Sequence, residues 1–148
     1  MSEPESTLLC RGIPRGLDRP ALRLFFARLR EEVAGGRAFS CMLTRDKELQ
    51  RLNSQFLGHD YPTDVLSFPS GEQEGPLGEI AISYDRAAAQ AAEFGHPIED
   101  EICILMLHGL LHLSGMDHES DRGKMRRAET SWRKKLGLPA GLIERARK

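Results

Sequence analysis

The segment from Ile98 to Ser114, which is apolar from Ile102 onward except for two histidines, a glycine and its final serine, places the strongest constraint on how this chain can fold. A helix that is apolar around its whole circumference has to be enclosed by the rest of the domain. Gly115 follows this segment, and glycine is the residue type that most often ends a helix. We therefore expect a central buried helix, in which His108 and His112 are polar residues that need an explanation.

Length and composition indicate a single domain over residues 1–148, with 40% hydrophobic and 29% charged residues. No apolar run approaches the roughly 18 residues needed to cross a bilayer, and the polar start lacks the features of a signal peptide. The cysteines Cys10, Cys41 and Cys103 lie far apart in apolar segments, as reduced thiols do. We expect a cytoplasmic protein without a membrane-embedded part.

The spacing of apolar residues predicts an α+β fold, in which a small mixed sheet of about four strands packs with five or six helices. Asp18 is expected to cap the first helix, and Gly35 and Gly36 to end it. The third and fourth strands are expected to form a hairpin. The expected strands are residues 7–10, 38–43, 65–68 and 78–83, and the later helices are residues 44 or 46 to 57, 85–94, 98–114 and 119–136, with a last turn or two within 139–148.

Charge is strongly segregated along the chain, although the net charge is only −1. Residues 122–148 carry ten Lys or Arg against two acidic residues, whereas residues 38–121 carry four against fifteen. This asymmetry suggests a metal-binding centre flanked by surfaces that bind phosphates, with Arg126, Arg127 and Arg133 as candidates. Charged helices that simply solvate their outer faces remain an equal alternative.

Three of the five histidines, His108, His112 and His118, lie within eleven residues. Residues four apart on a helix share one face, about 6 Å apart along the axis, so the first two can bind one ion. Gly115 can reverse the chain and bring His118 back as a third ligand. Three protein ligands leave an open position for water with a pKa of about 7, which is typical of catalytic zinc. The alternative is a set of core histidines bonded to backbone carbonyls.

The same spacing of histidines and glycine occurs in metzincin proteases, in which the first histidine is followed by the glutamate that acts as general base. Gly109 occupies that position here, which disfavours peptide hydrolysis. Asp117 lies beside His118 and could orient a ligand or accept a proton. It could equally cap the helix that follows.

Taken together, these motifs resemble the bacterial rRNA maturation factor family YbeY. The resemblance implies an α+β fold, one divalent ion, most simply Zn²⁺, on the three histidines, and a single-strand-specific metal-dependent endoribonuclease. It also implies action on precursor rRNA in ribosome biogenesis, including processing of the small-subunit rRNA 3′ end and ribosome quality control, with the small subunit and assembly factors as partners. The matching residues are His108, Gly109, Leu111, His112, Leu113, Gly115, Asp117 and His118, with Leu52, Asn53, Asp60, the run Pro62 to Pro69, and Leu77 to Ile80.

Three positions need separate treatment. Leu57 stands where the family usually has an arginine facing the metal cleft, and His59 stands where Lys or Arg is common. Glu79 matches an acidic family position and could contact the metal-bound water, or it could be a surface strand residue. The alternative functions are a non-catalytic ribosome-assembly factor with a structural zinc, favoured by Leu57, and a metzincin-like peptidase, favoured by spacing alone.

Overall fold

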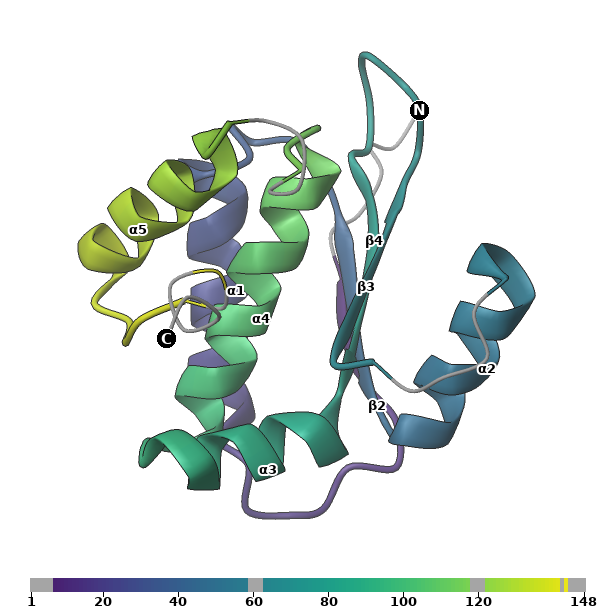
Figure 1. The fold of residues 1–148 in the computed structure, drawn as a ribbon, viewed down its shortest axis with the longest axis vertical. Coiled ribbons are helices and arrows are strands. Elements are labelled where there is room, and N and C mark those ends of the chain that lie inside the picture. The colour runs from purple at the N-terminus through teal and green to yellow at the C-terminus, as the bar shows by residue number, and fades with distance from the viewer. Residues whose placement is uncertain (1–6, 59–62, 118–121, 142, 144–148) are drawn as a thin grey trace.

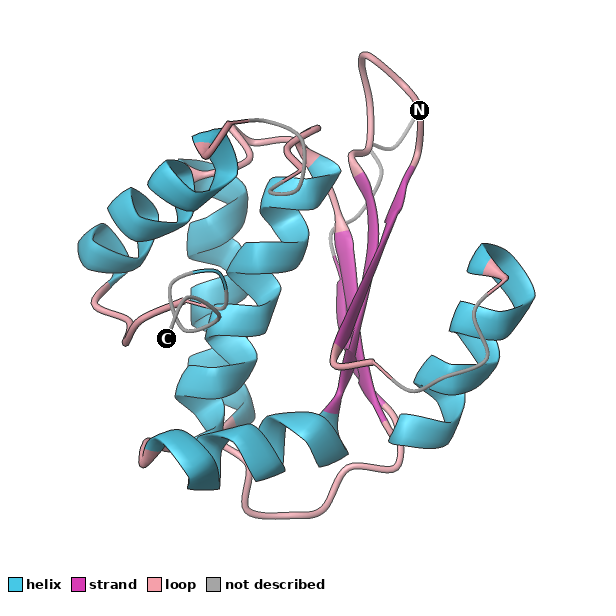
Figure 2. Cartoon of the chain, in the orientation of Figure 1, coloured by secondary structure: helices cyan, strands magenta, loops and turns pink. Residues whose placement is uncertain are grey.

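The computed structural model describes residues 7–58, 63–117, 122–141 and 143. These residues form a four-stranded mixed sheet and five helices, so the predicted α+β fold is confirmed (Figure 2). In the sheet order β1-β2-β4-β3, the first two pairings are parallel and β3 pairs antiparallel with β4, as the predicted hairpin requires. The strands are β1 (Thr7–Cys10), β2 (Ser40–Thr44), β3 (Val65–Pro69) and β4 (Gly78–Ser83), and the helices are α1 (Arg19–Glu32), α2 (Asp46–Leu57), α3 (Tyr84–Phe94), α4 (Ile98–Leu113) and α5 (Lys124–Leu136).

Helix α4 lies at the centre of the fold, between the sheet and the helices α1 and α5 (Figure 1). Every residue from Glu101 to Leu111 is buried, which confirms the expectation of a central helix from the predominantly apolar sequence of this segment. Helix α2 packs on the opposite side of the sheet (Figure 1). The molecule therefore has a thick apolar layer on the α4 side and a thinner layer on the α2 side.

The strand β4 shows how side chains are distributed between these two layers. Successive strand residues point to opposite faces of a sheet. Ile80 and Ile82 belong to the main core around α4, whereas Ala81 belongs to a smaller cluster with Leu49 and Leu66 on the α2 side. The exposed Glu79 shares the α2 side with Ala81, because the two are separated by one residue.

Some helix ends follow the predicted signals, but α1 ends at Glu32 with Val33 at its C-cap, before the predicted Gly35 and Gly36. Asp18 caps α1 by accepting a hydrogen bond from the backbone N–H of Ala21 at 3.1 Å. Gly58 ends α2 in the left-handed conformation that glycine allows, with φ of 73°. Helix α5 begins at Lys124 and not at Glu119, because Arg122 and Gly123 have φ of 59° and 85°, which a right-handed helix excludes.

Other expectations can be placed against this fold. Cys10, Cys41 and Cys103 are free thiols, and burial raises the pKa of Cys103 to about 12. Within the described ranges, no helix has the length and apolar character that a membrane crossing requires. Most of the predicted final helical turn, residues 139–148, lies outside the described residues.

Candidate metal centre and cleft

The second half of α4 presents two histidines on one face of the helix. The imidazole rings of His108 and His112 have centroids 4.8 Å apart and planes inclined at 78°. His108 is buried and His112 is half-buried. Both line an open cleft of about 520 Å³ between α4 and the outer strand β3. The other lining residues are Thr63, Asp64, Val65, Leu66, Ser67, Pro69 and Asp117.

Each of these imidazoles is oriented through its Nδ1 atom. His108 Nδ1 lies 2.8 Å from the Glu129 carboxylate, and His112 Nδ1 lies 2.9 Å from the carbonyl oxygen of Met116. A carbonyl oxygen can only accept, so His112 Nδ1 donates, and an ionised Glu129 requires the same of His108. A neutral imidazole protonated at Nδ1 carries its lone pair on Nε2, which is the form that binds a metal ion. This donor set therefore fits a divalent metal ion.

The predicted third ligand, His118, lies outside the described residues. Within the described part of the chain, no group of three or more His, Cys, Asp or Glu side chains could hold a metal ion. The chain reversal that a third ligand needs is present, since Gly115 has φ of 94° and the N–H of Met116 donates to the carbonyl of Leu111 at 3.2 Å. Convergence of the three histidines stays a prediction.

Asp117 is exposed and lines the cleft beside the two histidines. Its alternative role as a helix cap is not realised, because α5 starts seven residues later, with Gly123 at the N-cap and no side-chain cap. Asp64 is the other carboxylate at the cleft, and it accepts a hydrogen bond from the Gln90 side chain at 3.2 Å. The motif around Asp64 was recognised in the sequence, but its place in the cleft was not.

Gly109 packs directly against the sheet. A Cβ atom added at this position would lie 2.8 Å from Ile80 Cγ2, closer than ordinary packing allows. The Gly109 carbonyl also accepts a hydrogen bond from Ser67 Oγ at 3.0 Å, which joins α4 to β3. A glutamate at position 109 would collide with the sheet, so this chain has no place for the metzincin base.

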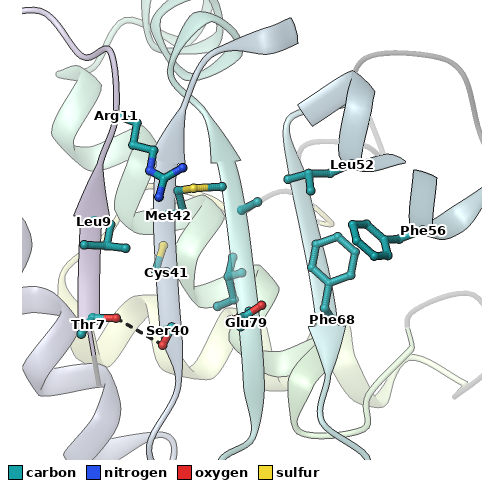
Figure 3. Close-up of a pocket in the computed structure, with 12 residues that line it drawn as sticks. Thr7, Leu9, Arg11, Ser40, Cys41, Met42, Leu52, Phe56, Phe68 and Glu79 are labelled. Carbon is teal, nitrogen blue, oxygen red and sulfur yellow. Dashed lines mark hydrogen bonds between the residues drawn. The ribbon is translucent and has the colours of Figure 1, made fainter. Parts of the chain in front are cut away.

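Glu79 does not lie where it could contact a water molecule bound to a metal ion at the two histidines. Its side chain lines a groove of about 440 Å³ between the sheet and α2, together with Phe56 and Phe68 (Figure 3). The histidine cleft lies on the other side of the sheet, because Ile80, the next residue, is the one that packs on α4. The expectation that Glu79 acts on the metal water is therefore corrected in favour of a surface strand residue.

Leu57 is 45% exposed at the end of α2 and does not line the histidine cleft. His59 lies outside the described residues.

The outer face of α5 carries a cluster of cations, which we call the α5 basic surface. Its four cations are Arg126, Arg127, Lys134 and Lys135, and none of them forms an ion pair with a described residue. Other arginines of the chain do form such pairs, namely Arg28, Arg45, Arg51 and Arg86. Arg133, a candidate from the sequence, is half-buried and does not belong to this surface. The α5 basic surface consists of Arg126, Arg127, Thr130, Ser131, Lys134 and Lys135 around a shallow depression of about 590 Å³.

Sequence reasoning missed Glu129. It is the only acidic residue of α5, whose other charged residues are basic, and its side chain is fully buried on the inner face of that helix. The available signal was its place on the apolar side of the helix, four residues after Met125, which is also buried.

Comparison with known proteins places the chain in a family. Residues 21–137 match the family model described as Endoribonuclease YbeY. A protein named Endoribonuclease YbeY from Solibacter usitatus (strain Ellin6076) is 60% identical over 147 residues, covering 98% of both chains. Another of that name from Koribacter versatilis (strain Ellin345) is 44% identical over 133 residues, covering 90% of this chain and 87% of its own. The solution structure of TM1509 from Thermotoga maritima superposes with a TM-score of 0.59 at 30% identity over 85% of each chain. With its sequence matched over most of its length, this chain belongs to the YbeY family.

Proposed function

We propose that this protein is a metal-dependent endoribonuclease that cleaves single-stranded RNA during rRNA maturation and ribosome biogenesis. Small-subunit precursor rRNA is the proposed substrate, in 3′ end processing and ribosome quality control, and the small subunit and its assembly factors are the proposed partners. The chain is proposed to act as one cytoplasmic domain over residues 1–148. Family membership and the curated relatives named Endoribonuclease YbeY support the reaction class.

The observation that carries this proposal is the oriented histidine pair. His108 and His112 both have their Nδ1 atoms bonded to acceptors, so the Nε2 lone pairs belong to the metal-binding tautomer. We propose that these two residues and His118 hold one Zn²⁺ ion. A bound zinc ion would supply Lewis acidity and lower the pKa of water at the site. Imidazole ligands also suit other divalent ions, so metal analysis belongs to the test.

The chain's own groups have distinct proposed roles. The carboxylate of Asp117 is exposed in the cleft, where it can orient a ligand or accept a proton from one. The edge of β3 and the two imidazoles leave an open channel between them, which an extended single strand can enter. The α5 basic surface supplies four cations that form no ion pair with any described residue, and we propose that they bind the phosphates outside the cleft.

A second candidate function is a non-catalytic ribosome-assembly factor with a structural zinc. The observation that favours it is Leu57, an exposed apolar residue where the family usually presents an arginine. Without that guanidinium the chain loses a bidentate phosphate contact. RNA binding without cleavage would then be the expected behaviour.

The test compares wild type, His112→Ala and the control His96→Gln for metal content and for cleavage of a labelled single strand. His96 bonds to Glu101 in the first turns of α4, away from the cleft, so its variant controls for loss of a histidine. We expect about one zinc per chain and slow cleavage in wild type and control, and neither in His112→Ala. Cleavage that survives in His112→Ala contradicts the proposed centre. Full zinc content without cleavage in wild type favours the assembly factor.

A further inference from the structure

The buried carboxylate of Glu129 connects two parts of the chain that are distant in sequence. Its Oε2 atom lies 2.8 Å from His108 Nδ1, and its Oε1 atom accepts a hydrogen bond from the backbone N–H of Ile143 at 2.9 Å. The side chain has no exposed surface. One oxygen therefore holds a proposed metal ligand and the other holds the C-terminal segment.

The C-terminal segment reaches Glu129 only because residue 141 is a glycine. A Cβ atom at Gly141 would overlap the carboxylate, since it would fall 2.6 Å from Glu129 Cδ and 2.8 Å from Cγ. Gly141 is absent from the residues with positive φ, so its backbone conformation is open to any residue. Close approach to Glu129, and not chain geometry, is what position 141 requires.

We propose that Glu129 is a positioning residue for His108, and that the C-terminal segment carrying Gly141 and Ile143 completes the outer shell of the metal centre. This inference rests on the metal centre proposed above. A carboxylate bonded to Nδ1 fixes the tautomer and the ring orientation of a ligating histidine. The N–H of Ile143 in turn holds that carboxyl group in place through its hydrogen bond to Oε1. Zinc affinity then depends on the C-terminal segment through the Glu129 carboxylate.

Glu129→Gln separates this role from simple packing, because glutamine has almost the same shape. The two oxygens of Glu129 face two N–H donors, from His108 and Ile143. An amide offers one oxygen and one NH₂ group, so it can accept from only one of these donors. The variant must either release the C-terminal segment or present a donor to His108 Nδ1, which favours the wrong tautomer for binding through Nε2.

Gly141→Ala acts on the same contact from the other side and leaves the carboxylate in the chain. Glu101→Gln is the matched control, since Glu101 is also fully buried and bonded to a histidine, with 2.7 Å between its Oε1 and His96 Nε2. Glu101 and His108 are seven residues apart on α4, or about 10 Å along the axis. The control therefore removes a buried carboxylate without altering the cleft.

The experiment measures zinc affinity of the full-length proteins by competition with a chromophoric chelator, and the protonated nitrogen of His108 by heteronuclear NMR of the metal-free proteins. Circular dichroism checks that each variant is folded. We expect Glu129→Gln to weaken zinc binding about 10- to 100-fold, the usual effect of losing such a partner, and Gly141→Ala to weaken it about tenfold. His108 should be protonated at Nδ1 in wild type and lose that preference in Glu129→Gln, while Glu101→Gln leaves both readouts unchanged.

Unchanged zinc affinity in folded Glu129→Gln overturns the role of Glu129, and equal weakening in Glu101→Gln overturns it by showing a general loss of stability. Unchanged affinity in Gly141→Ala overturns the role of the C-terminal segment. None of these readouts needs RNA cleavage, so they stand apart from the nuclease assay. A wild-type protein that binds no zinc overturns the proposed centre and this inference together, whereas zinc binding without cleavage leaves the inference standing.

Discussion

Removing two cations from the α5 basic surface is expected to make RNA binding less sensitive to salt. The variant is Arg127→Ala/Lys134→Ala, because both residues are exposed, lie seven apart on one face of α5 and form no ion pair among the described residues. Each cation that neutralises a phosphate releases condensed counterions from the RNA. The affinity of the wild type should therefore fall steeply as salt rises.

The expected size of the change follows from the number of contacts removed. For a single strand, the slope of log affinity against log salt changes by about 0.7 for each phosphate contact. Losing two contacts should flatten the slope by about 1.4. Between 50 and 200 mM salt, the wild type should then lose about sevenfold more affinity than the variant.

The assay is fluorescence anisotropy of a labelled single strand at several salt concentrations, with a chelator present to prevent cleavage. Lys47→Ala/Arg51→Ala is the matched control, since it also removes one lysine and one arginine, both exposed, from α2 on the other side of the sheet. Both double variants have a net charge of −3, two below the −1 of the wild type. An unchanged slope in the α5 variant would show that these two residues do not contact phosphates and only solvate the helix surface. An equal flattening in the α2 control would show that overall charge, and not the α5 surface, governs binding.

Three further outcomes are expected. Leu57→Arg should raise single-strand cleavage by roughly tenfold, since one charged hydrogen bond to phosphate is worth about 1.5 to 3 kcal/mol, and unchanged initial rates would contradict a phosphate role at this position. Gly109→Ala should lower the free energy of unfolding, because overpacking against Ile80 costs about 1 to 3 kcal/mol and the gain in helix propensity returns only about 1 kcal/mol. Urea unfolding measures this difference, and an unchanged midpoint would show that Ile80 can move. The hydrogen bond from Arg45 holds the pKa of Asp85 below its usual range, so its contribution to stability is present above the unfolded pKa of about 3.9 and is lost as pH falls through the folded pKa. Asp85→Asn should therefore destabilise the protein at pH 7 by less than about 1 kcal/mol, and the loss should shrink as pH falls through the folded pKa. A loss of the same size at every pH in urea unfolding would refute this sign.

Features that depend on local sequence were predicted well. The burial of α4 followed from its apolar circumference, the cap at Asp18 followed from residue type, and the end of α2 at residue 57 was predicted correctly. The start of α5 was predicted too early, because residues 119–122 are charged or polar types that a helix surface accepts, although the backbone at Arg122 and Gly123 does not allow a right-handed helix. Local spacing also placed His108 and His112 together, since both lie on one helix.

Features that depend on which surfaces meet could not be predicted in the same way. Alternation along β4 puts Glu79 and Ile80 on opposite faces of the sheet, but the sequence does not state which face packs on α4. The close packing of Ile80 on Gly109 decides this, and it removes Glu79 from the cleft. Glu129 was missed for a related reason, because its partner His108 is 21 residues away on another helix.

Gly109 connects the fold to the chemistry of the cleft. Its lack of a side chain lets α4 lie against β4, and its carbonyl bonds to Ser67 on β3. These contacts fix the orientation of α4, so that its face with His108 and His112 lies beside β3 at the edge of the sheet. The same contacts exclude a glutamate from position 109, so the general base of a metzincin and this helix packing cannot coexist. Among the described residues that line the cleft, Asp117 is the carboxylate that follows the turn at Gly115, on the loop expected to carry His118. We therefore propose that Asp117, and not a residue of α4, would take part in any proton transfer there.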